Sequence, residues 1–143
     1  ETAKTTPKKS ADDYWADAKV AFEAKKWADA RELYKKLALG FPDHDKADDA
    51  QYFRGETYFQ EKSSDSAMGE YQKVWDKFPN SDLADDALFR AGESAELLKN
   101  CTEARAYFGE IKEKYPKSSL AKKAGEKDKA LKKAASDKKK CSS

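Results

Sequence analysis

The stretch FPDHDKADDA at residues 41–50 decides the fold, because it returns as FPNSDLADDA at 78–87 and as YPKSSLAKKA at 115–124. Each copy begins 37 residues after the one before it. A sequence that repeats at a fixed period of this length is typical of repeat proteins, in which each unit packs on its neighbours. We therefore expect a row of three similar units.

The residues before each aromatic–proline pair form one face of a helix. In the first unit this face consists of Ala30, Tyr34, Leu37 and Phe41, and the later units repeat it as Ala67, Tyr71, Val74 and as Ala104, Phe108, Ile111. Spacings of four, three and four residues are those of a single helical face. The proline then ends the helix, because the residue before a proline is disfavoured in the α conformation.

A second helix in each unit carries a small residue at one place, namely Ala18, Gly55 and Gly92. Glycine inside a helix costs ~1 kcal/mol relative to alanine. Its recurrence therefore predicts that the two helices of a unit approach each other closely there.

The pattern predicts seven helices near residues 10–25, 28–40, 47–61, 65–77, 84–98, 102–114 and 119–135. The expected N-caps are Ser10, Asp45, Ser81 or Asp82, and Ser118 or Ser119. Short polar turns at 25–26, 62–64 and 99–100 make neighbouring helices antiparallel. We expect a disordered extension over 1–9, a repeat domain over 10–135 (repeats 10–46, 47–83 and 84–118, cap helix 119–135) and a basic flexible tail over 136–143. The alternative is an ordinary helical bundle with coincidental spacing.

The composition excludes several classes of protein. The 143 residues suit one domain. Although 39% of the residues are charged, the 3 Trp, 7 Tyr and 7 Phe argue against disorder, and 6 Gly with 4 Pro argue against a turn-rich β-sandwich. No apolar run approaches the ~20 residues of a membrane-spanning helix.

Charge is distributed unevenly along the chain. Residues 117–143 carry a net charge of +7, whereas residues 11–116 carry −7. A basic end of this kind can attract nucleic acid or an anionic membrane. It holds neither arginine nor aromatic residues, however, and lysine is the weaker residue for recognising phosphate. We therefore expect a solvated cap helix and no nucleic-acid partner.

The sequence shows no catalytic constellation. His44 is the single histidine, and although Asp43 or Asp45 would complete an acid–base pair, a solvated loop histidine is the simpler interpretation. There is no glycine-rich phosphate loop and no nucleophile elbow. Three adjacent side chains are too few for a specific metal site. We expect no enzyme activity, no catalytic residue, no metal and no cofactor.

Two cysteines, Cys101 and Cys141, lack the spacing of zinc or redox motifs. In an exported protein an even count permits a disulfide, and stacking of the last helix on the sixth would bring the pair together. Two unpaired thiols are the alternative. The chain begins at Glu1 rather than Met, which a removed signal peptide or a shortened chain explains equally.

The repeat resembles the tetratricopeptide repeat (TPR), a family with a 34-residue period, small residues in both helices, an aromatic residue in the second and a closing proline. Here each repeat has three extra residues after the proline. Residues 78–87 resemble the YPxSxxAxxA linker of bacterial envelope TPR proteins, and AQYFRGETYF at 50–59 is similar to their AxYWLGExYY helix. Within that group the pattern is nearest to the Tol-Pal-associated CpoB (YbgF) family and more distant from the BamD family.

The resemblance covers about residues 11–125. It implies a right-handed superhelical solenoid in the periplasm or at the outer membrane, which binds an envelope protein or peptide without catalysis. The first helix of each pair would line the concave side. The expected partner-binding residues are Asp12, Trp15, Lys19, Phe22, Asp49, Tyr52, Glu56, Phe59, Asp86, Phe89, Glu93 and Glu96.

This face combines aromatic anchors with carboxylates that would attract a basic partner. Tyr52 and Phe89 are expected to be half in the core, whereas Trp15 and Phe59 are expected to be the exposed contacts. The alternative function is a self-associating module whose repeats stack end to end. The oligomeric state and the partner stay open at this point.

Overall fold

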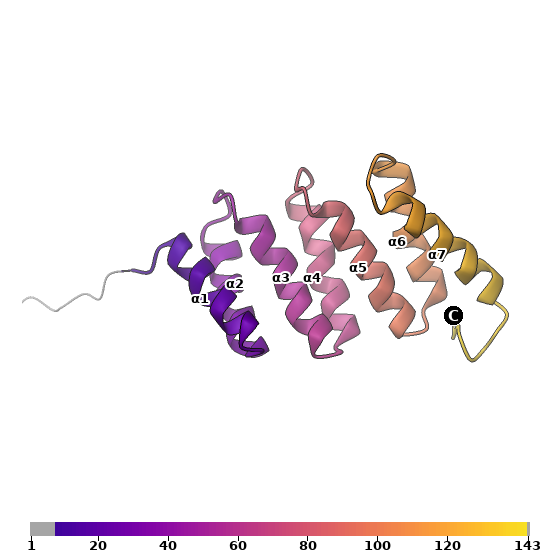
Figure 1. Cartoon of the computed structure of the whole chain (residues 1–143), viewed down its shortest axis with the longest axis horizontal. Helices are drawn as coiled ribbons and strands as arrows, with labels where there is room; N and C mark the ends of the chain where they lie inside the picture. Colours follow the sequence, from indigo (N-terminus) through magenta and orange to yellow (C-terminus); the bar gives the residue numbers. More distant parts are fainter. Residues whose placement is uncertain (1–7, 143) are drawn as a thin grey trace, which may run out of the picture.

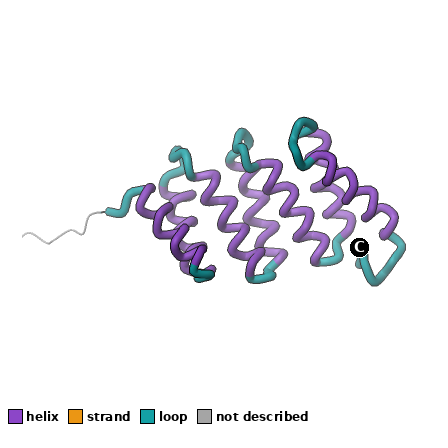
Figure 2. The backbone as a smooth tube through the Cα atoms, viewed as in Figure 1, coloured by secondary structure: helices purple, strands orange, loops and turns teal. Residues whose placement is uncertain are grey.

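The computed structural model describes residues 8–142, and within this range the chain consists of helices joined by short turns, with no strand (Figures 1 and 2). The helices are α1 (Ala11–Glu23), α2 (Trp27–Gly40), α3 (Ala47–Gln60), α4 (Ser64–Lys77), α5 (Ala84–Leu97), α6 (Cys101–Lys114) and α7 (Ala121–Ala134). Each packs on its neighbours in the chain, so the molecule is an elongated row. The predicted all-α solenoid is confirmed, with helix ends within two residues of those expected. Most of the extension predicted over 1–9 lies outside the described residues.

Only the first of the N-caps expected at the starts of α1, α3, α5 and α7 forms. The Ser10 hydroxyl accepts a hydrogen bond from the backbone N–H of Asp13, and the Asp13 carboxylate accepts one from the N–H of Ser10. The other three helices begin after Lys46, Leu83 and Leu120, which make no side-chain cap. The predictions of Asp45, Ser81 or Asp82, and Ser118 or Ser119 as caps are therefore wrong.

The linker serines tie consecutive repeats together instead. Ser81 donates from its hydroxyl to the Asp48 carboxylate on α3 (2.5 Å) and accepts from the N–H of Leu83. Ser118 makes the same pair of bonds one repeat later, to Asp85 on α5 and from the N–H of Leu120. These serines point their oxygens back across the linker, which is why they do not cap the next helix.

His44 occupies the place of these serines in the first linker, 37 residues before Ser81. Its Nδ1 accepts from the N–H of Lys46 (3.1 Å), and its Nε2 lies 3.1 Å from the Asp12 carboxylate. With Nδ1 accepting from Lys46, Nε2 is the ring nitrogen that can donate a hydrogen bond to Asp12, and Nδ1 also lies 3.1 Å from the Asp45 carboxylate. His44 therefore links two repeats and is not a solvated loop residue.

The hairpin turns show the same regularity. Lys25, Lys62 and Lys99 all adopt positive φ, at 60°, 63° and 60°. In the first turn the N–H after this lysine, that of Lys26, bonds to the carbonyl of Ala21 (2.9 Å), which closes the end of α1. A left-handed residue at this place is a common way to end a helix.

The predicted close approach within each hairpin is confirmed. A Cβ placed on Gly55 would lie 2.5 Å from a ring carbon of Tyr71, and one on Gly92 would lie 2.6 Å from the ring of Phe108. Both rings are fully buried. The glycines thus leave room for an aromatic side chain of the second helix to lie against the backbone of the first.

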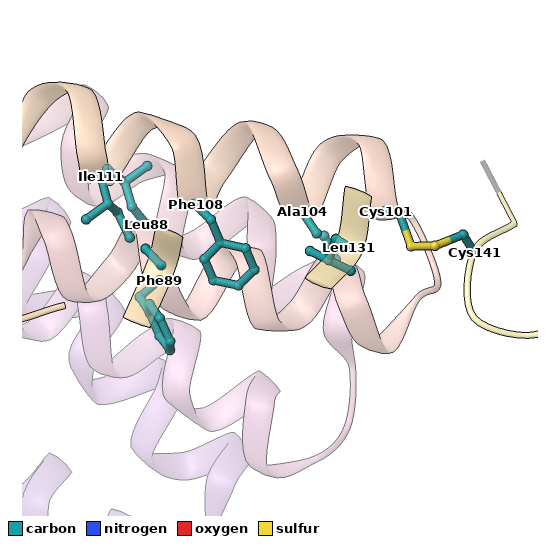
Figure 3. Packing of buried hydrophobic residues seen from close by; sticks show 10 residues of the cluster. Leu88, Phe89, Cys101, Ala104, Phe108, Ile111, Leu131 and Cys141 are labelled. Atoms are coloured by element: carbon teal, nitrogen blue, oxygen red, sulfur yellow. A yellow bond between two sulfur atoms is a disulfide. The ribbon is translucent and has the colours of Figure 1, made fainter. Parts of the chain in front are cut away.

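The C-terminal end closes the stack. Phe108 and Ile111 of α6 pack with Leu131 of α7 in one buried cluster (Figure 3). Cys101, the first residue of α6, forms a disulfide with Cys141, at a Cα–Cα distance of 5.4 Å. The segment after α7 therefore turns back towards α6.

The last helix lacks the small residue that the first helices of the three hairpins carry. On α7, Lys129 stands where Gly55 and Gly92 stand on α3 and α5, and it is exposed. A long side chain at this place occupies the space that the aromatic ring of a second helix would need.

Among residues 8–142, no helix is both long enough and apolar enough to span a bilayer.

Candidate partner-binding face

Side chains from the first helices of successive hairpins meet on one surface, which we call the first-helix face. Trp15 of α1 lies against Phe53 of α3 with ring centroids 6.1 Å apart. Arg90 of α5 lies over the Phe59 ring of α3 at 4.4 Å. Lys127 of α7 bonds to the Glu96 carboxylate of α5, continuing the face to the end of the row.

The N-terminal part of this face is an aromatic seam. Trp15 packs edge-on against Tyr34 of α2 (5.7 Å), and Phe22 packs edge-on against Phe53 (5.5 Å). Trp15 and Phe22 are half-buried, and they fill the space between α1, α2 and α3. Lys19, also expected in the site, is exposed on α1. Trp15 is therefore less available to a partner than the sequence suggests.

A buried ion pair lies at the centre of the face. Glu56 is only 6% exposed, accepts from the Tyr71 hydroxyl (2.6 Å) and pairs with Nε of Arg90 (2.9 Å). Burial raises the pKa of Tyr71, and the Glu56 charge raises it further. Burial alone would lower the pKa of Arg90, but the Glu56 carboxylate raises it above its ordinary value. Glu56 thus holds α3, α4 and α5 together rather than facing a partner.

A hollow of about 370 Å³ opens beside this ion pair. Its lining consists of Phe59, Glu93, Glu96, Leu97 and Lys127. Leu97 is 63% exposed and is the large apolar side chain of this hollow that is most open to solvent. Glu93 lies 3.4 Å from Arg90, and Glu96 is 2.7 Å from Lys127. An aromatic ring, an aliphatic side chain and two carboxylates suit the stem and head of a cationic side chain.

Two aspartates of the expected site lie one repeat apart and are half-buried. Burial raises the pKa of Asp49, and so does the adjacent Asp48. Burial raises the pKa of Asp86 in the same way, with a further contribution from Asp85. The nearest cation to Asp49, Lys46 Nζ, is 3.9 Å away. Both carboxylates are therefore poorly compensated and would gain from an added positive charge.

Tyr52 and Phe89, the two aromatic residues expected to be half in the core, differ in how deeply they are buried. Tyr52 is half-buried and lies 5.6 Å from the Tyr71 ring. Phe89 is only 5% exposed and packs edge-on against Phe108 (5.2 Å; Figure 3). Its remaining open side faces Lys123. Phe89 is therefore a core residue and offers no contact to a partner.

Three residues of this face, Arg90, Leu97 and Lys127, were not predicted from the sequence. Arg90 on α5 and Lys127 on α7 are 37 residues apart, so they occupy the same repeat position. The period of the sequence could therefore have indicated a cationic position on these two helices. Leu97 carries no such signal, because its counterpart in the preceding repeat is Gln60.

Within residues 8–142, no group of three His, Cys, Asp or Glu side chains is placed to bind a metal. Both ring nitrogens of His44 are engaged in the linker.

Comparison with known proteins identifies the architecture. A tetratricopeptide-repeat family model matches residues 49–81 and 86–118. Among solved structures, the TPR2B domain of yeast Sti1, in a complex with pHsp70, superposes with a TM-score of 0.68 at 16% identity over 86% of this chain and 96% of that one. A comparison with curated protein sequences found no significant match. TPR domains in general mediate protein–protein interaction through the surface formed by their stacked helices. The matched segments of the second and third hairpins are therefore tetratricopeptide repeats, and the row of hairpins has the fold of a TPR solenoid.

Proposed function

We propose that this protein is a scaffold that binds a protein or peptide partner at the hollow between α3, α5 and α7. The observation that carries the proposal is the exposure of Leu97 beside Phe59 and two carboxylates. A bound side chain would cover the leucine, and its charge would compete with Arg90 and Lys127 for the carboxylates of Glu93 and Glu96. The TPR architecture supports the proposal because solenoids of this kind present their stacked helices to partners.

The partner we infer carries a lysine or arginine next to apolar residues. The chain's own cations illustrate this mode of binding, since Arg90 stacks on Phe59 while Lys127 pairs with Glu96. A cation over an aromatic ring gains about 0.5–2 kcal/mol, more as water is excluded. The half-buried Asp86 on the same face would add to the attraction.

The proposed location is the bacterial cell envelope, in the periplasm or at the outer membrane. Its support is the resemblance of the linkers and of residues 50–59 to the CpoB and BamD families. The Cys101–Cys141 disulfide agrees with it, because disulfides persist in oxidising compartments. Fractionation of cells that express the natural gene, with a cytosolic marker as reference, tests the location directly.

Binding can be tested with two short peptides of equal length, one in which Lys alternates with Leu and one in which Glu replaces each Lys. Chemical shifts of the labelled protein should move at Phe59, Glu96 and Leu97 with the Lys peptide alone. The double substitution Glu93→Gln and Glu96→Gln should weaken this binding about fivefold or more, because both carboxylate charges are lost.

Glu113→Gln is a matched control, since Glu113 is an exposed carboxylate on α6 that does not line the hollow. Shifts that map outside the hollow, or equal binding by the Gln variants, would exclude this site. Equal shifts with the Glu peptide would exclude the inferred cationic partner.

A further inference from the structure

Within residues 8–142, no element packs on the outer side of the first hairpin, whereas every later hairpin has a neighbour there. One repeat position, 37 residues apart in successive units, shows this difference. On α3 and α5 it is held by Thr57 and Ser94, and both are fully buried. Thr57 contacts Arg31 of the preceding α2 at 3.4 Å. Val20 stands at the same place on α1 and is 68% exposed. A helix-sized site is therefore open at this end of the row.

Two adjacent hollows mark this site, which we call the N-terminal end face. One has a volume of about 510 Å³ and is lined by α1 and α2 side chains that include Val20, Ala24 and Leu33. The other has a volume of about 640 Å³ and includes Tyr14 and Leu39. Glu32 lines both, so the two form one continuous surface with an apolar floor. Leu39 is 51% exposed.

Charges divide this surface into two parts. Lys9, Lys35 and Lys36 lie around the hollow at the start of α1. Asp17, Asp29 and Glu32 outnumber Lys26 around the other hollow, where α1 ends and α2 begins, and Asp17 pairs with Lys9 at the boundary of the two parts (2.8 Å). A face with one basic and one acidic part is complementary to itself, because a two-fold axis places each part against its opposite in a second copy.

The opposite end of the molecule does not offer such a site. Lys129 fills the place where α7 would need a small residue for a further helix. Continuous stacking of the first end on the last is therefore disfavoured, and a contact between two identical first ends is the arrangement that covers Val20.

We propose that the N-terminal end face is a dimer interface with a second copy of this chain. The 13 residues of α1 make the face about 20 Å long, and two helices side by side make it about 20 Å wide. A contact of that size buries about 800–1,200 Å² in total, at the low end for specific interfaces. An interface of that size suits a reversible dimer, which we expect to see from micromolar concentrations upward.

Sedimentation equilibrium of the full chain from micromolar to millimolar concentration tests this interface. The mass should rise from 16.1 kDa towards twice that value, and less so at high salt. Val20→Glu should weaken the dimer by about tenfold or more, because it places a charge on the apolar floor. Leu98→Glu is the matched control, since Leu98 is also exposed and repeat 2 already carries Glu61 at that place.

A second pair of variants keeps the test valid even where one substitution disturbs folding. Asp29→Lys with Glu32→Lys makes the face basic, and Lys35→Glu with Lys36→Glu makes it acidic. Each variant alone should stay monomeric, and an equal mixture should form the heterodimer. A wild-type chain that stays monomeric at millimolar concentration overturns the proposal, as does a mixture that does not pair or a dimer that Val20→Glu leaves unchanged. A monomer would leave the face to a different protein.

Discussion

Replacing Gly55 by alanine tests how the hairpins are built. The new Cβ would lie 2.5 Å from one ring carbon of Tyr71 and 2.6 Å from the next. Ordinary carbon contacts lie at about 3.5–4.0 Å, so the overlap is about 1 Å. The Tyr71 ring cannot swing away, because it is fully buried and its hydroxyl is bonded to Glu56. The helices α3 and α4 must therefore move apart.

The expected magnitude follows from two opposing effects. Overpacking a well-packed site costs about 1–3 kcal/mol. Alanine recovers about 1 kcal/mol of helix propensity over glycine. We expect a net loss of about 1–2 kcal/mol for Gly55→Ala. A Cβ added at Gly69, inside α4, would meet no atom within 4 Å, so Gly69→Ala should instead stabilise the protein by about 0.5–1 kcal/mol.

Thermal and urea unfolding followed by circular dichroism measure both variants side by side. A difference of about 2 kcal/mol between them corresponds to several degrees in Tm for a chain of this size. Equal stability of Gly55→Ala and Gly69→Ala would refute the explanation of the small-residue position by close approach. Ala18 in the first hairpin shows that alanine can be accommodated, so a loss well below 1 kcal/mol would mean that the second hairpin adjusts as the first does.

Four further predictions concern the C-terminal disulfide, a hairpin turn and two carboxylates. Cys141→Ser should cost up to about 4 kcal/mol, because the disulfide closes a 40-residue loop, and hydrogen exchange should rise first in α7. Lys62→Gly should raise the unfolding free energy by about 0.5–1 kcal/mol in urea titrations, because glycine adopts a φ of 63° without strain. The pKa of Asp86 is raised in the folded protein, so the stability of the wild type falls as the pH rises from the ordinary aspartate pKa through this raised value. Asp86→Asn should therefore stabilise the protein at neutral pH, and it should give no such gain below the ordinary aspartate pKa. Asp85→Asn should lose about 1 kcal/mol at neutral pH instead, because its carboxylate accepts from a linker serine.

The fold could be predicted from the sequence because the residues that recur in every repeat are the ones that pack in the core. Ala30, Ala67 and Ala104 are all fully buried, as a position common to three units requires. The linker was harder to predict. Ser81 has the residue type of an N-cap, but its oxygen bonds across the linker to Asp48, and this partner lies 33 residues away. Local propensity cannot choose between a cap and such a long-range bond.

The candidate site was only partly predictable for the same reason. The helical pattern correctly gives Glu56 and Phe59 to the first helix of the second repeat. The pattern does not show that Arg90, which lies 34 residues after Glu56, pairs with Glu56 and covers the ring of Phe59. Contacts between repeats depend on the rotation of one hairpin relative to the next. The period of the repeat does not give this rotation angle.

The positions at which the repeats differ are therefore the ones that distinguish this protein from a generic solenoid. Phe22 and Phe59 stand at one repeat position, and the third repeat places Glu96 there. That change opens the hollow, because a carboxylate held by Lys127 replaces a ring that would pack into the seam. The substitution thus exchanges an aromatic contact for an ion pair between α5 and α7, and it leaves the hollow that the proposed function assigns to a partner. The same reasoning applies to Val20, whose counterparts Thr57 and Ser94 are polar yet buried, while Val20 is apolar and exposed.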